Sequence, residues 1–226
     1  MRVIVLVMLV SAVGTVFSQK TKTYNQLLAE ISIQKNKLSD SYNSGDTIKQ
    51  NKVISVSKNY VYTQLIDNIF PNWYGTEWDY NGYSNQPQKG QIACGYFVST
   101  TLKHIGFNLN RYKVAQQYSH SIVNTLCKNV KQITNNDTLK LFSYINSNKN
   151  QLYIVGLDNH VGFISKENEG LFFIHSSYID PVAVVKEKAS ESIALLSSNL
   201  FVLGHFSEND QIIKYWLTQN QISIKK

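Results

Sequence analysis

Two cysteines and five histidines are the side chains of this chain that are best suited to nucleophilic and acid–base chemistry. Cys94 lies in the stretch KGQIACGYFVSTTLKHIG, directly before an apolar pattern with helical spacing. The unpaired N–H groups of a helix N-terminus favour a thiolate, so this position suits a nucleophile. Cys127, in NTLCKN, is interpreted as a buried small hydrophobe. A disulfide between the two cysteines would instead make Cys94 inert.

A nucleophilic cysteine needs a base and a group that orients the base. His160 and His175 lie in DNHVGFISKENEGLFFIHSSY, which predicts a β-hairpin. A two-residue loop at Asn168–Glu169 would pair Gly162 with His175 and put both histidines on one face, within reach of a ring-to-ring hydrogen bond. A three-residue loop would put His175 on the opposite face. Two half-buried strand histidines without a catalytic role are the alternative interpretation.

The other histidines suit these roles less well. His104 falls within the helix that follows Cys94, and His120 lies in a polar helical stretch, so both are expected at the surface. His205 follows a predicted strand and is left undecided. The His and Asp residues lack a ligand spacing such as H-E-x-x-H, so no metal or other cofactor is expected.

The elements that would position these residues separate into helices followed by strands, which is typical of the α+β class. Helical spacing predicts helices over residues 23–42, 58–70, 94–106, 111–126 and 136–148. Apolar and β-branched runs predict strands over residues 151–157, 160–165, 170–178, 180–185 and 199–207. Residues 71–91 contain five aromatic residues and no periodic pattern, and they predict a long functional loop.

The first eighteen residues, MRVIVLVMLVSAVGTVFS, are typical of a signal peptide that is cleaved before Gln19. The alternative is a membrane anchor, but the apolar run is short for a span of about 20 residues. An exported protein, periplasmic or secreted, without stable membrane insertion is therefore expected. The remaining chain is predicted to form an N-terminal helical region over residues 19–70 and a catalytic domain over residues 71–226.

Composition and charge narrow the class of partner. The chain of 226 residues is 43% hydrophobic and 16% charged, as in globular proteins. Its net charge of +7 becomes +6 without Arg2, which favours acidic polymers and anionic surfaces, including cell envelopes. The lysines are scattered and no block of five or more basic residues occurs, so nucleic acid is not an expected partner.

The order of Cys94, His160 and His175 resembles the NlpC/P60 family of papain-like cysteine peptidases, which cut peptides of bacterial cell walls. The resemblance extends from about Trp73 to Tyr178. WDYNG is similar to the aromatic-x-Trp-Gly-Gly segment ahead of the family cysteine, and GFNLNRYKVAQQ to the segment after the nucleophile helix. NHVGFI and FFIHSS resemble the family's His-Val-Gly-Ile and Ile-His-Ala strands.

The resemblance implies a papain-like fold, with the nucleophile helix packed on an antiparallel sheet and extra N-terminal helices. It implies a secreted amidase or endopeptidase that acts on peptidoglycan or a related peptide. Cys94 would attack the amide carbonyl, His160 would take its proton, and His175 would accept a hydrogen bond from Nδ1–H of His160. Trp78 and Tyr80 would line the substrate cleft.

The chain departs from the family pattern at the nucleophile. Ala93-Cys94-Gly95-Tyr96 stands where the family has Asp-Cys-Ser-Gly, whose Asp and Ser help to recognise the amino end of the wall peptide. A family tyrosine upstream appears here as Trp78, and the loop before Cys94 is longer than usual. These differences describe a divergent member with its own substrate preference.

Two alternatives stay open from the sequence. The first is another papain-like amide enzyme, C39-like or CHAP-like. The segment Ile179–Pro181 is similar to the Asp-Pro of C39-like peptidases, and in that interpretation Asp180 would orient His160. The non-enzymatic alternative is a secreted wall-binding module that kept the fold and lost its activity.

Overall fold

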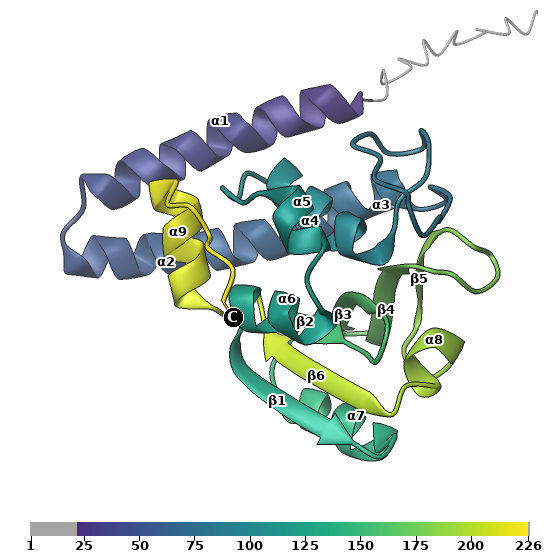
Figure 1. Cartoon of the computed structure of the whole chain (residues 1–226). Helices are drawn as coiled ribbons and strands as arrows, with labels where there is room; N and C mark the ends of the chain where they lie inside the picture. The colour runs from purple at the N-terminus through teal and green to yellow at the C-terminus, as the bar shows by residue number, and fades with distance from the viewer. Residues whose placement is uncertain (1–21, 226) are drawn as a thin grey trace, which may run out of the picture.

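The computed structural model describes residues 22–225, so the predicted signal peptide lies outside the described residues (Figure 1). The fold is α+β, as expected, with helices packed on an antiparallel sheet. The helices are α1 (Tyr24–Asn43), α2 (Thr47–Thr63), the π-helical turn η1 (Gln64–Ile69), α3 (Phe70–Trp73), α4 (Cys94–His104), α5 (Arg111–Ala115), α6 (Ser119–Leu126), α7 (Thr138–Asn146), α8 (Ile193–Leu196) and α9 (Asp210–Thr218). The strands are β1 (Lys128–Thr134), β2 (Gln151–Gly156), β3 (Val161–Glu167), β4 (Gly170–Ser176), β5 (Val184–Lys188) and β6 (Leu200–His205).

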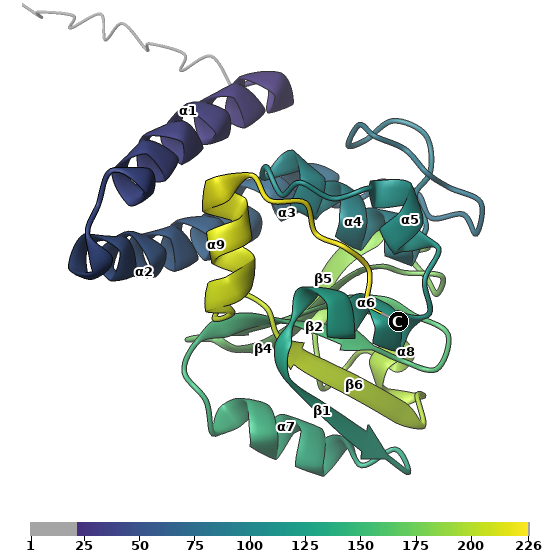
Figure 2. The same cartoon turned by 60° about the vertical axis from the view of Figure 1, so that its left-hand side comes forward.

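The six strands form one sheet in the order β1-β6-β2-β3-β4-β5. Alternate side chains of a strand face opposite sides, and the sheet accordingly separates two apolar cores. Phe163 and Ile174 belong to the core that contains α4, α6 and the N-terminal helices, whereas Ile164 and Phe173 belong to the core with α7 and α8. Figure 2 shows α7 below the sheet and α4 and α6 above it.

The helix that carries Cys94 is positioned by one buried face. Its apolar residues at helical spacing are buried, as the sequence predicts: Phe97, Val98, Thr101, Leu102 and Ile105. This face packs on β3 and β4, where the ring of Phe97 lies 6.1 Å from that of Phe163 between centroids. The apolar contact fixes α4 against the sheet and therefore sets where its first residue lies.

The N-terminal helices α1 and α2 form an antiparallel pair that packs with α9 (Figure 1). Their buried residues belong to the same apolar core as α4. Tyr24 anchors α1, because its hydroxyl lies 2.8 Å from Nδ1 of His104 and accepts a hydrogen bond from Nε1 of Trp73. The expectation that His104 lies at the surface is therefore wrong, since these contacts cover its ring. The division into two domains at residue 70 stays a prediction.

The helix expected to stop at Pro71 is longer than the pattern indicated, because α2, η1 and α3 follow one another from Thr47 to Trp73. In η1 the N–H of Phe70 donates to the carbonyl of Leu65, five residues back. Pro71 has no N–H to donate, and the wider π turn before it lets the helix continue through this residue.

Other differences follow from long-range packing. The single helix expected over residues 111–126 is two helices, α5 and α6, and β5 begins at Val184 and not at residue 180. Strand β1 was not predicted, because it is polar and mostly exposed at the sheet edge. Helix α9 was also not predicted, although four of its apolar residues are buried at helical spacing.

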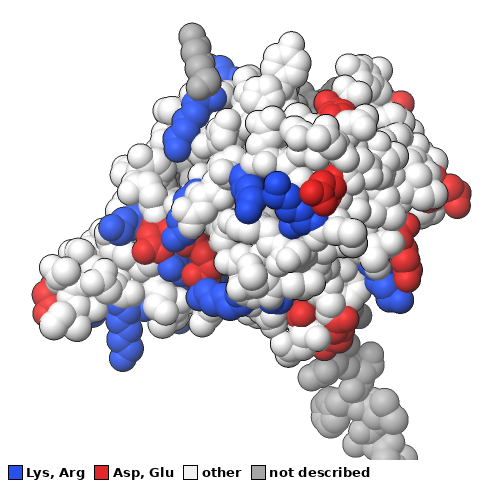
Figure 3. Space-filling model, turned by 90° about the horizontal axis from the view of Figure 1, so that it is seen from below, with Lys and Arg blue, Asp and Glu red and all other residues white. Residues whose placement is uncertain are grey.

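The described surface carries mixed charge. Lys58 pairs with Asp210, and Lys149 pairs with Glu208. Figure 3 shows basic and acidic side chains beside one another on the face seen from below. Within residues 22–225, no helix is both long enough and apolar enough to span a bilayer.

Candidate active site

The hairpin of β3 and β4 brings His160 and His175 together. Phe163 lies opposite Ile174, and Glu167 opposite Gly170, which leaves the predicted two-residue loop and places position 162 across from His175. Nε2 of His160 lies 2.8 Å from Nδ1 of His175, with the two rings nearly perpendicular at 86°. The predicted contact is confirmed, but it is made by Nε2 of His160 and not by Nδ1.

Gly162 makes room for this pair. A Cβ at this position would lie 2.8 Å from Cβ of His175 and 2.7 Å from the ring of Phe173. Both distances are shorter than a side chain tolerates, so any larger residue would push His175 away from His160. The contact between the two imidazoles therefore requires a glycine at position 162.

Cys94 is the first residue of α4 and is partly exposed. The backbone of Val161 lies near enough to the thiol to lower its pKa, as do the backbone groups of Gly95 and of Cys94 itself. Val161 directly follows His160, so the sulfur lies near the first residue of β3. Helix α4 packs on one face of the sheet, whereas His175 stacks on Phe173 of the other core, at 4.1 Å between ring centroids. Helix α4 and the imidazole pair therefore pack on opposite faces of the sheet, near the first residue of β3.

Burial changes the protonation of these groups. It raises the pKa of the Cys94 thiol, and the backbone hydrogen bonds lower it by less. Burial and the neighbouring His175 lower the pKa of His160 well below its usual range, because an imidazolium is disfavoured there. His160 is 3% exposed and His175 is 0% exposed. At neutral pH the resting site thus holds a neutral thiol and a neutral imidazole, contrary to the thiolate that the helix N-terminus suggested.

Glu187 is a third polar partner that the sequence analysis missed. Its Oε1 lies 3.0 Å from Nε2 of His175. This hydrogen bond is the largest cause of the lowered pKa of the Glu187 carboxyl. The predicted strand ended at Val185, which lies opposite His175. Continuing the alternation for two residues would have placed Glu187 on the same face as His175, so a signal was present.

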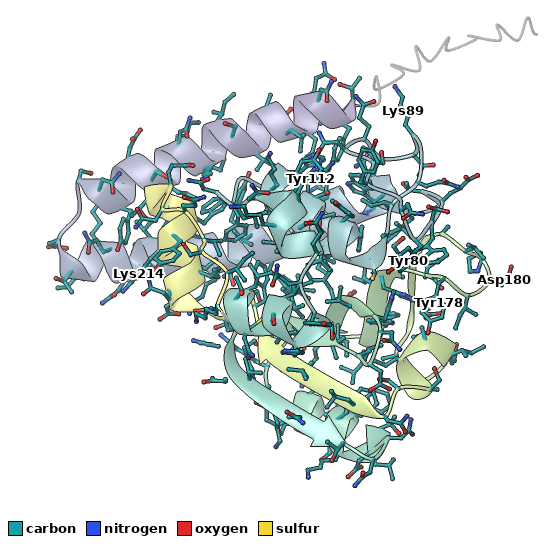
Figure 4. The ribbon with its side chains drawn as sticks, viewed as in Figure 1. Tyr80, Lys89, Tyr112, Tyr178, Asp180 and Lys214 are labelled. Carbon is teal, nitrogen blue, oxygen red and sulfur yellow. The ribbon has the colours of Figure 1, made fainter. Side chains whose placement is uncertain are left out.

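Aromatic rings extend from His160 toward the surface. The ring of Tyr178 lies 5.3 Å from that of His160, and the ring of Trp78 lies 6.1 Å from that of Tyr178, both between centroids. Tyr178 was not predicted. Tyr80 is 80% exposed and is not among the rings that touch these residues. Figure 4 labels Tyr80 and Tyr178 on the same side of the molecule. Trp78 is thus near the site through Tyr178, and the role of Trp78 and Tyr80 in binding stays a prediction.

The long loop before Cys94 is held by the end of the sheet. The N–H of Gly75 donates to the carbonyl of Val184 at 2.9 Å, and the N–H of Trp78 donates to the carbonyl of Val182 at 3.0 Å. Further along, Oγ of Ser176 donates to the carbonyl of Ile92 at 2.6 Å. These bonds fix both the tryptophan and the approach to Cys94 relative to β4 and β5.

Asp180 lies apart from the imidazole pair. It is exposed on the loop between β4 and β5, and Figure 4 shows it at the outer edge of the molecule. The hydrogen-bond partner of His160 is His175. Within the described part of the chain, Asp180 is therefore not a hydrogen-bond partner of His160.

The remaining candidates are placed as follows. Cys127 is a free, buried thiol in the apolar core that also contains α4, as expected of a small hydrophobe. Cys94 is free as well. His120 is exposed, as predicted, and stacks on Tyr118. His205 is buried, with Nε2 2.9 Å from the hydroxyl of Tyr144. Within residues 22–225 no group of three or more His, Cys, Asp or Glu residues could hold a metal ion.

Comparison of the chain with models of known protein families, with curated proteins and with solved structures finds no match. The site is therefore described by its own geometry.

Proposed function

We propose that the protein is an exported, papain-like cysteine amidase or endopeptidase of the NlpC/P60 type, which cleaves amide bonds of bacterial cell-wall peptides. One observation carries the proposal. The backbone of Val161, directly after His160, lies near enough to the Cys94 thiol to lower its pKa, and His160 is itself held by His175. The proposal assigns Cys94 as nucleophile, His160 as base and His175 as orienting group, in the order that the family resemblance implies.

The reaction would begin from the neutral pair. As Sγ of Cys94 attacks the carbonyl carbon, its proton moves to Nδ1 of His160, since Nε2 of that ring is occupied by His175. The resulting imidazolium gives this proton to the leaving amine, which departs and leaves a thioester on Cys94. His160 then takes a proton from water, the hydroxide attacks the thioester, and the proton returns to the departing sulfur.

The start of α4 would stabilise the oxyanion. Ala93 at the N-cap makes no side-chain hydrogen bond, and the first turn of α4 contains no acidic residue. The backbone N–H of Cys94 and the positive end of the helix dipole are therefore not opposed by a carboxylate. In this chain the loss of the family aspartate favours negative charge on the substrate oxygen.

The substrate differs from that of typical family members at its amino end. At Gly95, where the family has serine, a Cβ would lie 2.5 Å from the carbonyl oxygen of Ala115. A serine cannot fit there without moving α5, so contacts to the peptide must come from elsewhere. The half-exposed ring of Tyr178 lies beside His160, and that of Trp78 lies beside Tyr178, and together they offer apolar surface for a peptide.

Digestion of purified peptidoglycan tests the proposal. The purified protein and its Cys94→Ala variant are incubated with wall material, and the released fragments are identified by mass spectrometry. We expect fragments with a new amine and a new carboxylate from the wild type and none from the variant. If the folded wild type sediments with the wall but releases nothing from any peptide cross-link or stem, the wall-binding alternative is correct.

A further inference from the structure

We propose that Glu187 is a positioning residue that sets the tautomers of both histidines, so that Nδ1 of His160 carries the lone pair that accepts the Cys94 proton. The inference rests on the proposed function for its catalytic meaning. Its structural basis is the continuous row of contacts from Oε1 of Glu187 to Nε2 of His175 at 3.0 Å, and from Nδ1 of His175 to Nε2 of His160 at 2.8 Å.

The donor and acceptor chemistry of these groups determines which atom of each contact carries the hydrogen. An ionised carboxylate only accepts hydrogen bonds, so Nε2 of His175 must carry the hydrogen that faces Glu187. A neutral imidazole has one N–H, so Nδ1 of His175 is then an acceptor. Nε2 of His160, which faces that acceptor, must therefore be a donor. The hydrogen of His160 lies on Nε2 and its Nδ1 is left as the base.

The surroundings of Glu187 keep its carboxyl ionised and hold it beside His175. It lies opposite Phe173 in the pairing of β4 and β5, on the face of His175, and it also hydrogen-bonds Ser192 at the start of α8. The hydrogen bond from His175 lowers the pKa of its carboxyl. The lysines on either side have their own carboxylates, since Lys186 pairs with Glu167 and Lys188 pairs with Glu191.

The groups that face the imidazole pair are few. The thiol of Cys94 lies beside the backbone at the start of β3, the ring of Tyr178 lies against His160, and Glu187 contacts His175. When His160 accepts the thiol proton, the new imidazolium faces His175, which donates to a carboxylate. Glu187 stabilises that positive charge without taking a proton itself, so the number of protons in the site is unchanged.

Nuclear magnetic resonance of the imidazole nitrogens tests the tautomers without any substrate. In the wild type at pH 7.5 we expect both histidines to be neutral with the hydrogen on Nε2. Glu187→Ala should give a mixture of tautomers, and Glu187→Gln should keep the wild-type pattern, because its Oε1 can still accept from His175. Glu191→Gln, an exposed residue four positions away, is the matched control and should change nothing. A hydrogen on Nδ1 of His160 in the wild type, or unchanged tautomers in Glu187→Ala, would overturn the inference.

Kinetics on the same variants tests the consequence. We expect Glu187→Ala to lower kcat about tenfold to hundredfold with little change in KM, as for other groups that orient a reacting residue. Removing the carboxylate lowers the pKa of the imidazole pair, so the acid limb of kcat/KM should move to lower pH. Glu187→Gln should recover most of kcat, and Glu191→Gln should match the wild type. An unchanged kcat and acid limb in an active enzyme would refute the role of Glu187.

The proposed function and the role of Glu187 can be refuted independently of each other. If the wild type cleaves no amide, the proposed function is wrong, and the tautomer measurement still decides whether Glu187 orders the imidazole pair. If the wild type is active and Glu187→Ala lowers kcat with normal tautomers and an unmoved acid limb, the residue only supports the fold. Thermal unfolding of each variant identifies that case.

Discussion

Cys94 and Cys127 are the same side chain at opposite ends of two helices. Cys94 is the first residue of α4, where backbone N–H groups are unpaired, and the nearby backbone of Val161 lowers the pKa of its thiol. Cys127 is the C-cap of α6, where its own N–H donates to the carbonyl of Val123. The first environment favours negative charge, and the second does not.

Burial alone does not separate the two cysteines, because it raises the pKa of both thiols. What differs is the set of neighbours. Cys94 lies near the backbone of Val161 and is partly exposed, whereas Cys127 packs against Gly204 in the apolar core. The comparison teaches that neither burial nor a helix terminus by itself distinguishes a nucleophilic cysteine from a packing residue.

The same substitution at both positions should give opposite results. We expect Cys94→Ser to lower amidase activity at least about 10³-fold, since the nucleophile is lost. Cys127→Ser should keep activity close to the wild type, because no group at the site contacts it. Release of peptide fragments from peptidoglycan, measured per folded molecule, checks both variants. Comparable activity in Cys94→Ser and the wild type would disprove the nucleophile.

The histidines should give a graded series on the Cys94 side. His160→Ala should lose about 10³-fold or more in kcat, because no proton acceptor remains. His175→Ala should lose about tenfold to hundredfold, since the ring of His160 can then turn, and His175→Asn should lose less because its amide oxygen can accept from Nε2–H of His160.

Asp180→Ala is the control for this series and should have wild-type activity, since the residue lies apart from the imidazole pair. The measurement is the initial rate of amide cleavage for all four variants. If Asp180→Ala is inactive and His175→Ala is active, the C39-like assignment is correct and His175 has no orienting role.

Alkylation separates the two thiols without a substrate. Iodoacetamide should modify Cys94 and leave Cys127 unmodified while the protein is folded, because only the first thiol is partly exposed. Burial raises the pKa of the Cys94 thiol. Its alkylation rate should therefore reach half its maximum at a pH above the value of an ordinary thiol, about 8.5.

Peptide mass spectrometry identifies the modified cysteine across a pH series, and denatured protein is the control in which both cysteines should react. A fast reaction of Cys94 near pH 6 would show a resting thiolate–imidazolium pair and would contradict the neutral pair inferred from burial.

The effects of the two serine substitutions on stability should be in the reverse order of their effects on activity. Cys127→Ser places a hydroxyl in an apolar core, and we expect the free energy of unfolding to fall by about 1–3 kcal/mol. Cys94→Ser keeps a polar atom at a partly exposed helix start, and its effect should stay within about 0.5 kcal/mol. Denaturant unfolding of both variants measures the difference. Equal losses would mean that Cys94 is also a packing residue.

The sequence by itself determined the local parts of the site. The apolar face of α4 placed Cys94 at a helix start, and the pattern around Asn168–Glu169 set the pairing that brings His160 and His175 together. Both are predictable because they depend on periods of 3.6 and 2 residues within one segment. The α+β class follows in the same way from the order of the segments.

The tertiary structure decided the remaining parts of the site. The proximity of Cys94 to Val161, the contact of Glu187 with His175, and the ring of Tyr178 beside His160 each join segments that the local pattern does not connect. The raised pKa of the Cys94 thiol is also a property of burial by distant residues. The physical reason is that hydrogen bonding between strands and desolvation depend on which segments pack together, and one segment's periodicity carries no information about its partners.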